Sequence, residues 1–324
     1  MRAWKFATVV ALVGAALAWM APNTRAQELP AGDIHLICGF PAGTGADTIV
    51  RFYAEKLRPL TGRTIVVENK PGAGGNIAIE YVAKSKPDGL TILITDATSL
   101  ASNMHLFKRP PVESVNAFQL LGSINHQAFM LAVDAKKPWT KLSDLTTAVK
   151  SKGEKATYAT TAPPSVVMAA IYKAGAGLDA VEVNYKRSSD TVNDLLSGAV
   201  DYAVIEPVFA TAQHRQGTLR VLAVSSTERL AAAPDLPTMN EQGIPMKLDL
   251  WWSGMVPAKT PRPVVEQLHK WFNQITASED AKKFLNTFAS DPWMVSPDEA
   301  QAELQKEVKS WGDFMRIAKI EPQG

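Results

Sequence analysis

The alternation of apolar runs and helical periodicity most constrains how this chain can fold. Several segments repeat one order: a short β-branched or apolar run, a loop of small polar residues, and then apolar residues at helical spacing. This order is typical of parallel strands joined by crossover helices. The sequence therefore predicts an α/β protein.

These units fall into two groups along the chain. The first group predicts strands at 33–40, 64–69 and 90–95, with helices at 47–60 and 76–84. The second predicts strands at 129–133, 156–160, 180–185, 202–206 and 219–224, with helices at 141–151, 165–174, 190–196 and 207–216. We expect residues 248–256 to return to the first sheet as a strand, and three helices to fill the chain to Lys319.

Such a pattern predicts two lobes, each a mostly parallel sheet flanked by helices. We expect residues 27–125 with 247–324 to form lobe 1, and residues 126–246 to form lobe 2. The two crossings between lobes would place hinges near 124–128 and 244–250. Residues 27–324 are also more numerous than those of a usual single domain, which favours two lobes.

Residues 1–26 have the pattern of a secretory signal peptide. Arg2 and Lys5 form a basic start, residues 7–21 an apolar middle, and Thr24-Arg25-Ala26 a cleavage site. The apolar run is too short and wrongly flanked for a stable membrane span. We therefore expect an exported protein.

Charge and cysteine content exclude several classes of function. Three of the 34 basic residues lie in the leader, which leaves 31 basic residues against 32 acidic ones. Such a near-neutral chain offers no clustered positive charge for phosphates, so we expect no nucleic-acid partner. Cys38 is the only cysteine, and no paired Cys or His ligand spacing occurs. We expect no internal disulfide, no metal and no cofactor.

The loop Gly39-Phe40-Pro41-Ala42-Gly43-Thr44-Gly45-Ala46-Asp47 follows the first predicted strand and leads into a helix. It lacks the lysine of a phosphate loop, and Thr48 stands where the dinucleotide fingerprint needs its third glycine. Its small residues leave the amides of the helix start uncovered, and these amides with the helix dipole favour a carboxylate. The alternative is a tight turn whose glycines serve backbone geometry alone.

Three further loops with hydroxyl groups follow predicted strands: Thr98-Ser99, Thr160 to Ser165, and Lys186 to Ser189. Ligands of doubly wound sheets bind outside the carboxyl ends of the strands. Two lobes with such ends make a cleft that can close on a small acid. The five histidines form no zinc-protease motif, and no G-x-S-x-G nucleophile elbow occurs, so we expect no enzyme.

Three stretches resemble a known family: Gly39 to Gly43 with Asp47, VVENKPGAGGNI at 66–77, and PDGLT at 87–91. With them the chain resembles the Bug family of periplasmic solute-binding proteins, the receptors of tripartite tricarboxylate transporters. The likeness covers essentially the whole mature chain. It implies a periplasmic-binding-protein-like (Venus flytrap) fold that captures a carboxylate in the periplasm and hands it to a membrane permease. We expect such a receptor to act as a monomer.

The resemblance also implies which residues contact the ligand. In lobe 1, main-chain groups of the first loop would hold one carboxylate, and a hydroxyl after the third strand would add a bond. In lobe 2, hydroxyl residues of two loops would supply the rest. The matching positions are Phe40, Ala42, Gly43, Thr44, Ser99, Thr160, Thr161, Ser165 and Ser188.

The chain departs from the family pattern at several of these loops. Ala162-Pro163-Pro164 replaces a glycine-rich run, Arg187 replaces a glycine, and Glu206 replaces an aspartate. Arg187 either grips a second carboxylate in a bidentate fork or is a solvated surface side chain. Glu206 either accepts a bond from a ligand amine or hydroxyl, pairs with Arg187, or caps the helix near Pro207. We favour the last two together.

Two aromatic residues bear on the kind of acid. Trp252 or Phe40 either stacks on an aromatic ligand or packs in the core. The leading hypothesis is a non-enzymatic receptor for a dicarboxylate, including aromatic ones such as terephthalate. The alternatives are a sensory module that signals to a membrane receptor, and a secreted enzyme acting on such acids, for which no catalytic constellation is recognisable.

Overall fold

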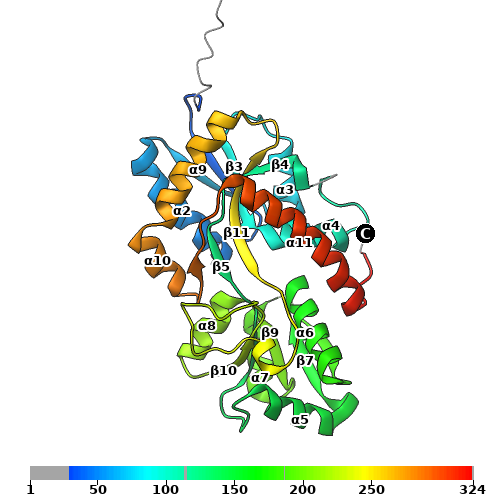
Figure 1. Cartoon of the computed structure of the whole chain (residues 1–324). Helices are drawn as coiled ribbons and strands as arrows, with labels where there is room; N and C mark the ends of the chain where they lie inside the picture. The colour runs from blue at the N-terminus through cyan, green and yellow to red at the C-terminus, as the bar shows by residue number, and fades with distance from the viewer. Residues whose placement is uncertain (1–28, 113–114, 186, 323–324) are drawn as a thin grey trace, which may run out of the picture.

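The computed structural model describes residues 29–112, 115–185 and 187–322 (Figure 1). The predicted signal peptide lies outside these residues. Two sheets, one above the other in Figure 1, are flanked by helices and form two lobes. Within the described ranges, no helix is both long and apolar enough to cross a membrane.

The sheet of lobe 1 has seven strands in the order β12-β5-β11-β3-β1-β2, with β4 also paired to β11. They are β1 (Ile34–Cys38), β2 (Ile65–Asn69), β3 (Thr91–Asp96), β4 (Phe118–Leu120), β5 (Asn125–Gln127), β11 (Leu250–Pro257) and β12 (Asp291–Pro292). The helices of this lobe are α2 (Gly45–Thr61), α3 (Asn76–Ala83), α4 (Ala97–Leu106), α9 (Arg262–Thr276), α10 (Glu279–Asn286) and α11 (Pro297–Ala318). Two short 3₁₀ turns are η1 (Ala73–Gly75) and η2 (Val115–Ala117).

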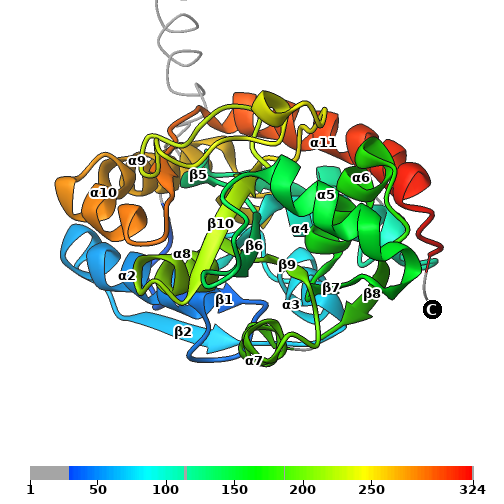
Figure 2. The ribbon, with the colours of Figure 1, turned by 90° about the horizontal axis from the view of Figure 1, so that it is seen from below.

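The sheet of lobe 2 has five strands in the order β10-β6-β9-β7-β8. They are β6 (Met130–Asp134), β7 (Thr157–Thr160), β8 (Val181–Asn184), β9 (Tyr202–Ile205) and β10 (Leu219–Val224). Its helices are α5 (Leu142–Lys152), α6 (Pro163–Ala176), α7 (Ser188–Ser197) and α8 (Pro207–Arg215), with 3₁₀ turns η3 (Gly153–Lys155) and η4 (Asn240–Gln242). Figure 2 shows these helices lying around the sheet, seen from below.

The two-lobed α/β fold is confirmed, but the strand pairing needs a correction. Parallel pairs join β1 to β2 and β3, and β7 to β8 and β9. The other pairs are antiparallel, so both sheets are mixed rather than mostly parallel. The reason is the crossing between lobes: β6 and β11 enter their sheets from the side of the other lobe and therefore run against β9 and β3. The predicted lobe boundaries stay predictions.

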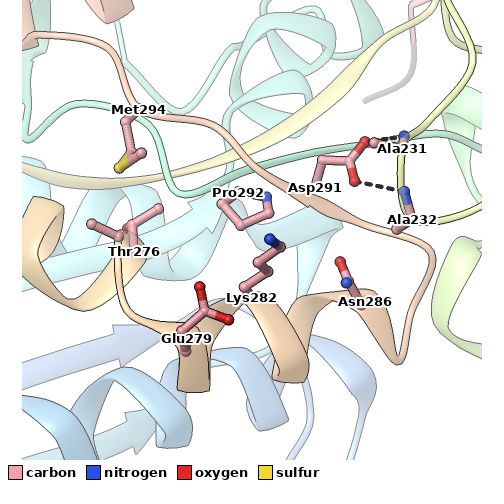
Figure 3. Close-up of a pocket in the computed structure, with 10 residues that line it drawn as sticks. Ala231, Ala232, Thr276, Glu279, Lys282, Asn286, Asp291, Pro292 and Met294 are labelled. Carbon is pink, nitrogen blue, oxygen red and sulfur yellow. Dashed lines mark hydrogen bonds between the residues drawn. The ribbon is translucent and has the colours of Figure 1, made fainter.

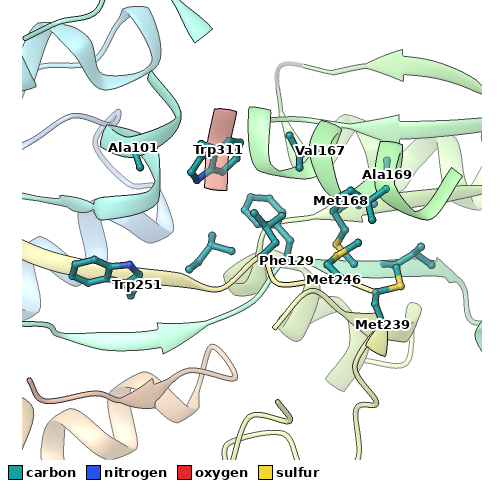
Figure 4. Close-up of a cluster of buried hydrophobic side chains, with 14 of the residues drawn as sticks. Ala101, Phe129, Val167, Met168, Ala169, Met239, Met246, Trp251 and Trp311 are labelled. Carbon is teal, nitrogen blue, oxygen red and sulfur yellow. The ribbon is translucent and has the colours of Figure 1, made fainter. Parts of the chain in front are cut away.

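The two lobes also share an apolar core (Figure 4). Trp311 of α11 lies toward Val167 of α6 in Figure 4, and the same cluster includes Met168, Phe129 and Trp251. Helix α11 thereby packs on α4 in lobe 1 and on α6 in lobe 2. Burying each such large side chain contributes about 1.5–3 kcal/mol. Any closing motion must therefore slide or preserve this packed contact.

Candidate ligand-binding cleft

The loop after β1 in lobe 1 and the loop after β9 in lobe 2 meet between the lobes, and we call this meeting place the cleft. The contact that shows this joins the first residue of α2 to the start of α8, because a Cβ atom on Gly45 would lie 2.8 Å from Cγ2 of Val208. The amides of the first helical turn have no acceptor inside their own helix. Two helix N-termini, with their positive dipole ends, thus meet at the cleft.

The β1–α2 loop is held by its own hydrogen bonds. Thr44 caps α2, because its Oγ1 accepts a bond from the amide of Asp47 at 3.3 Å. The amide of Gly43 donates to Oδ2 of Asp47 at 2.8 Å, and Thr44 Oγ1 donates to Pro41 O at 2.8 Å. Of the residues predicted to bind the ligand, Ala42 and Gly43 are exposed, but the Gly43 amide is already used.

Asp47 is the buried anchor of this loop. Besides the Gly43 amide, its carboxylate accepts bonds from Arg51 Nε and from Asn69 Nδ2, both at 2.8 Å. Asn69 also donates to Phe40 O at 3.0 Å. Burial alone would raise the pKa of Asp47, but the bonds from Arg51, Gly43 and Asn69 outweigh it and lower the pKa. Sequence reasoning missed Arg51 and Asn69 as loop supports, although Asn69 lies in the VENKPG motif.

The rings of Phe40 and Trp252 pack against each other in lobe 1, with centroids 5.9 Å apart and planes tilted by 39°. Trp252 is only 4% exposed and belongs to the apolar core, while Phe40 is half-buried at its edge. The indole Nε1 of Trp252 has no hydrogen-bond partner in the described part of the chain. Core packing therefore accounts for both rings, and stacking on an aromatic ligand stays a prediction.

Ser99 lies in the first turn of α4 rather than in a loop after the third strand. Asp96 caps this helix, accepting from Thr98 N at 2.8 Å and from Ser99 Oγ at 3.0 Å. Burial raises the pKa of Asp96 to about 6. The hydroxyl proton of Ser99 is therefore committed to Asp96, and a ligand must compete for it.

The predicted hydroxyl groups of the β7–α6 loop also have partners. Buried Thr160 donates from Oγ1 to Glu182 Oε1 at 2.5 Å and accepts from Asn184 Nδ2 at 3.1 Å. Buried Ser165 accepts from the amides of Thr161 and Ala162 at 2.9 and 3.0 Å, so it holds the start of α6. Thr161 is half-buried. Ligand contacts by these residues stay predictions.

Arg187 and Glu206 do not pair with each other, so that part of the expectation is wrong. Arg187 instead binds both carboxylate oxygens of Asp190 at 3.0 Å, and its side chain is 74% exposed. Arg187 is the N-cap residue of α7 and Asp190 lies in the first turn of this helix, so their ion pair forms within one helical turn. Ser188, which lies between them in the sequence, is half-buried. Ligand binding by Arg187 stays a prediction.

The expectation that Glu206 caps a helix is confirmed. Both of its carboxylate oxygens accept from the amide of Phe209 at 3.1 Å, at the start of α8. Glu206 has no ion-pair partner in the described ranges, and burial raises its pKa. A half-buried carboxyl group without a cation thus lies two residues from the contact between Val208 and Gly45.

A second hollow, of about 480 Å³, lies beside the cleft where α10 approaches lobe 2 (Figure 3). Asp291 accepts from the amides of Ala231 and Ala232 at 2.6 and 2.8 Å across it. Nearby, Arg215 of α8 donates to Asn286 O at 2.8 Å and to Thr287 O. None of the predicted ligand residues lines this hollow. Its contacts instead tie the two lobes together.

The model of the tripartite tricarboxylate transporter family receptor, TctC, matches residues 49–320 of the chain. The chain belongs to the TctC family. The family and the fold are those of solute-binding receptors, not of enzymes. In the part of the chain that the structure describes, no group of three or more His, Cys, Asp or Glu side chains could hold a metal ion.

Relatives of this TctC-family chain include Bug proteins, as the resemblance indicated. The UPF0065 protein of the tcbD–tcbE intergenic region of Pseudomonas sp. strain P51 is 30% identical, over 93% of this chain and 91% of that one. BugT of Bordetella pertussis is 28% identical, over 93% and 94%.

Solved structures agree with this assignment. The periplasmic binding protein BugD is 28% identical, with a TM-score of 0.78 over 91% of this chain and all of that chain. R. palustris Rpa4515, solved with adipate, is 25% identical, with a TM-score of 0.82 over 91% and 100%.

Proposed function

We propose that this TctC-family receptor captures a small dicarboxylate between its lobes in the periplasm and delivers it to the permease of a tripartite tricarboxylate transporter. The observation that carries the proposal is the meeting of the α2 and α8 N-termini at Gly45 and Val208. Converging positive helix ends favour an anion at this position. The adipate in Rpa4515, a relative with the same fold, supports a dicarboxylate.

In the proposed mechanism, the first carboxylate binds at the β1–α2 loop. Asp47 holds that loop in one shape, so the amides of Gly45 and Ala46 are ready before the ligand arrives. Such preorganisation reduces the entropy lost on binding. The ligand's far end then contacts the starts of α6 and α7 in lobe 2, at Thr161, Arg187 and Ser188.

Lobe closure is part of the proposal. A ligand shifts an equilibrium between open and closed forms only through contacts that it gains in the closed form. In this proposal, the contacts between Gly45 and Val208 and between Arg215 and the end of α10 form in the closed arrangement. We propose that residues 27–125 with 247–324 move against residues 126–246 as the ligand is bound and released.

We further propose that the dicarboxylate is aromatic, as terephthalate is. Phe40 is half-buried in the β1–α2 loop and packs on Trp252, so its ring would offer an apolar surface next to the proposed carboxylate position. Aromatic pairs in offset or tilted arrangements are worth about 0.5–1.5 kcal/mol beyond their buried area. We therefore expect an aromatic diacid to bind more tightly than an aliphatic one of equal length.

A thermal-shift screen with adipate, terephthalate, aspartate and benzoate tests the ligand class, because a ligand that binds only the folded state raises the melting temperature. We expect the diacids to raise it most. Small-angle scattering with and without the best diacid then tests closure, and a ligand-induced contraction is expected. Absence of any shift with all four acids would refute the carboxylate proposal, and loss of diacid uptake in a deletion strain would link the receptor to transport.

A further inference from the structure

Another cavity, of about 230 Å³, lies between α11 and the strands that connect the lobes, separate from the proposed carboxylate site and from the hollow at α10. The strands β5 and β11 pair here, with His126 opposite Trp251. The lining residues are His126, Asp249, Trp251, Trp293, Glu303 and Glu307. Three of these six side chains are carboxylates, which distinguishes this cavity from the helix N-termini of the cleft.

The carboxylates of this cavity are not equally compensated. Asp249 pairs with His126 Nε2 at 3.0 Å and accepts two bonds from Thr227. Glu303 pairs with Lys306 at 3.2 Å. Glu307 has no ion pair among the described residues, and its Oε2 is buried without a hydrogen-bond partner.

Negative charge surrounds Glu307 on the neighbouring elements. Burial, and then the charges of Asp96 at the start of α4, Glu303 and Asp249, raise the pKa of Glu307 well above its ordinary value. An isolated charge in a poorly solvated site is costly unless a counter-charge or a proton joins it. The cavity next to Glu307 is where such a counter-charge fits.

The indole rings form two walls of this cavity. Trp251 and Trp293 lie 5.4 Å apart with their planes at 89°. Trp251 is 1% exposed, and its Nε1 lies near the Glu307 carboxylate but makes no hydrogen bond of good geometry with any described residue. Indole rings and an uncompensated carboxylate in the lining of one cavity are features that bind organic ammonium ions.

We propose that this cavity binds a small organic ammonium ion, held by the Glu307 carboxylate and the indole rings that line the cavity. A metal ion is less suited, because the described residues offer no set of three metal-ligating side chains. The site joins α11, which packs on both lobes, to the connecting strands. A bound cation would therefore stabilise the arrangement of the lobes, whereas the cleft is proposed to bind an anion.

Calorimetry and melting curves of the full mature receptor with ethylammonium chloride test this site. Sodium chloride at the same concentration controls for ionic strength, and ethanol serves as the neutral counterpart. We expect saturable binding and a raised melting temperature with ethylammonium alone. Because a proton competes for Glu307, the apparent affinity should increase with pH. Equal responses to ethylammonium chloride and sodium chloride would overturn the proposal. A melting temperature that changes with pH but not with ethylammonium would overturn it as well.

Two variants locate the binding. Glu307→Gln keeps the shape but removes the charge, so ethylammonium should bind about tenfold more weakly or worse. Asp313→Asn makes the same chemical change at an exposed position of α11 and should leave ethylammonium binding unchanged. Glu303→Gln is the second cavity variant, should Glu307→Gln fold poorly. Undiminished binding in a folded cavity variant refutes the site, and an unchanged response to adipate shows that the anion cleft is intact.

Discussion

Gly45 and Val208 touch across the cleft so closely that a methyl group on Gly45 would lie 2.8, 2.9 and 3.0 Å from three carbons of Val208. Gly45 opens α2 in lobe 1, and Val208 lies in the first turn of α8 in lobe 2. The absence of a side chain at Gly45 is thus what allows the two helix ends to meet.

Gly45→Ala should weaken diacid binding while leaving the separate lobes folded. Overpacking a tight contact costs about 1–3 kcal/mol, and Val208 cannot yield easily because its β-branched side chain is stiff. Since the cost falls on the closed form, we expect affinity to drop about 5-fold to 150-fold by calorimetry. Adding Val208→Ala makes room for the methyl group and should restore binding. A single variant with native affinity would contradict this role of the contact.

Asp47→Asn should loosen the carboxylate loop. The substitution preserves the shape of the side chain but removes the charge that binds Arg51 and Gly43. Charge-assisted bonds of this kind contribute about 1.5–3 kcal/mol, so we expect a loss of about 2 kcal/mol in the free energy of unfolding by urea. Asp33→Asn, an exposed acid on the same lobe, is the matched control. Equal stability of both variants would show that Asp47 does not anchor the loop.

Asp96 should contribute to the free energy of unfolding, and this contribution should fall as pH rises from about 4 to 6. The folded pKa of about 6 exceeds the ordinary 3.8, so in this window the folded chain holds a proton that the unfolded chain has lost. A group of this kind stabilises at low pH and loses about 3 kcal/mol of stabilisation across the window.

The variant Asp96→Asn tests this term, because asparagine still caps α4 but cannot titrate. Denaturant unfolding at pH 4, 5 and 6 should give a flatter or more upward profile for the variant than for the native chain. Parallel profiles would assign the pH dependence to other groups, such as Glu307.

Glu206→Gln should strengthen binding of a diacid such as adipate. The native carboxyl faces no cation in the described ranges, so its ionised form disfavours a second anion in the cleft. Glutamine keeps an oxygen for the Phe209 amide and so preserves the cap. We expect affinity to rise by about tenfold, the scale of one charge-assisted contact. Weaker binding in the variant would indicate that Glu206 instead accepts a bond from the ligand.

Arg187→Ala should lower the affinity for a diacid at least about tenfold if the guanidinium leaves Asp190 to grip the second carboxylate. The matched variant Asp190→Asn releases Arg187 from its partner and should preserve or improve binding. An exposed ion pair alone contributes only about 0–1 kcal/mol, so stability should change little in either variant. Unchanged affinity in Arg187→Ala would show that Arg187 is a surface side chain that does not bind the ligand.

Much of the fold was predictable because its signals are local. Apolar runs marked β1, β3 and β6 to β10, and Ser296-Pro297 marked the start of α11 with a capping hydroxyl and a proline. Short strands such as β4, β5 and β12 were missed, because two or three residues give no periodicity. Helix α4 was missed as well, and with it the fact that Ser99 lies in a helix.

The candidate site was less predictable from the sequence than the fold. Sequence reasoning found the loops but assigned free hydroxyls to Thr160, Ser165 and Ser99, all of which have partners inside the protein. Ser99 and Ser165 bond to groups three or four residues away, as capping side chains do at a helix start, so their local spacing could have revealed these partners. Only Thr160 bonds to a distant residue, Glu182 on the neighbouring strand, and spacing along the chain does not reveal that partner.

The sequence by itself determined the family, the two-lobed α/β architecture and the position of the glycine-rich loop between β1 and α2, because glycines, caps and apolar periodicity act over a few residues. Only the tertiary structure decided that Gly45 meets Val208, that Arg187 pairs with Asp190 rather than Glu206, and that α11 joins both lobes. These relationships depend on how packed surfaces fit together, and close packing is a property of the whole fold rather than of any one segment.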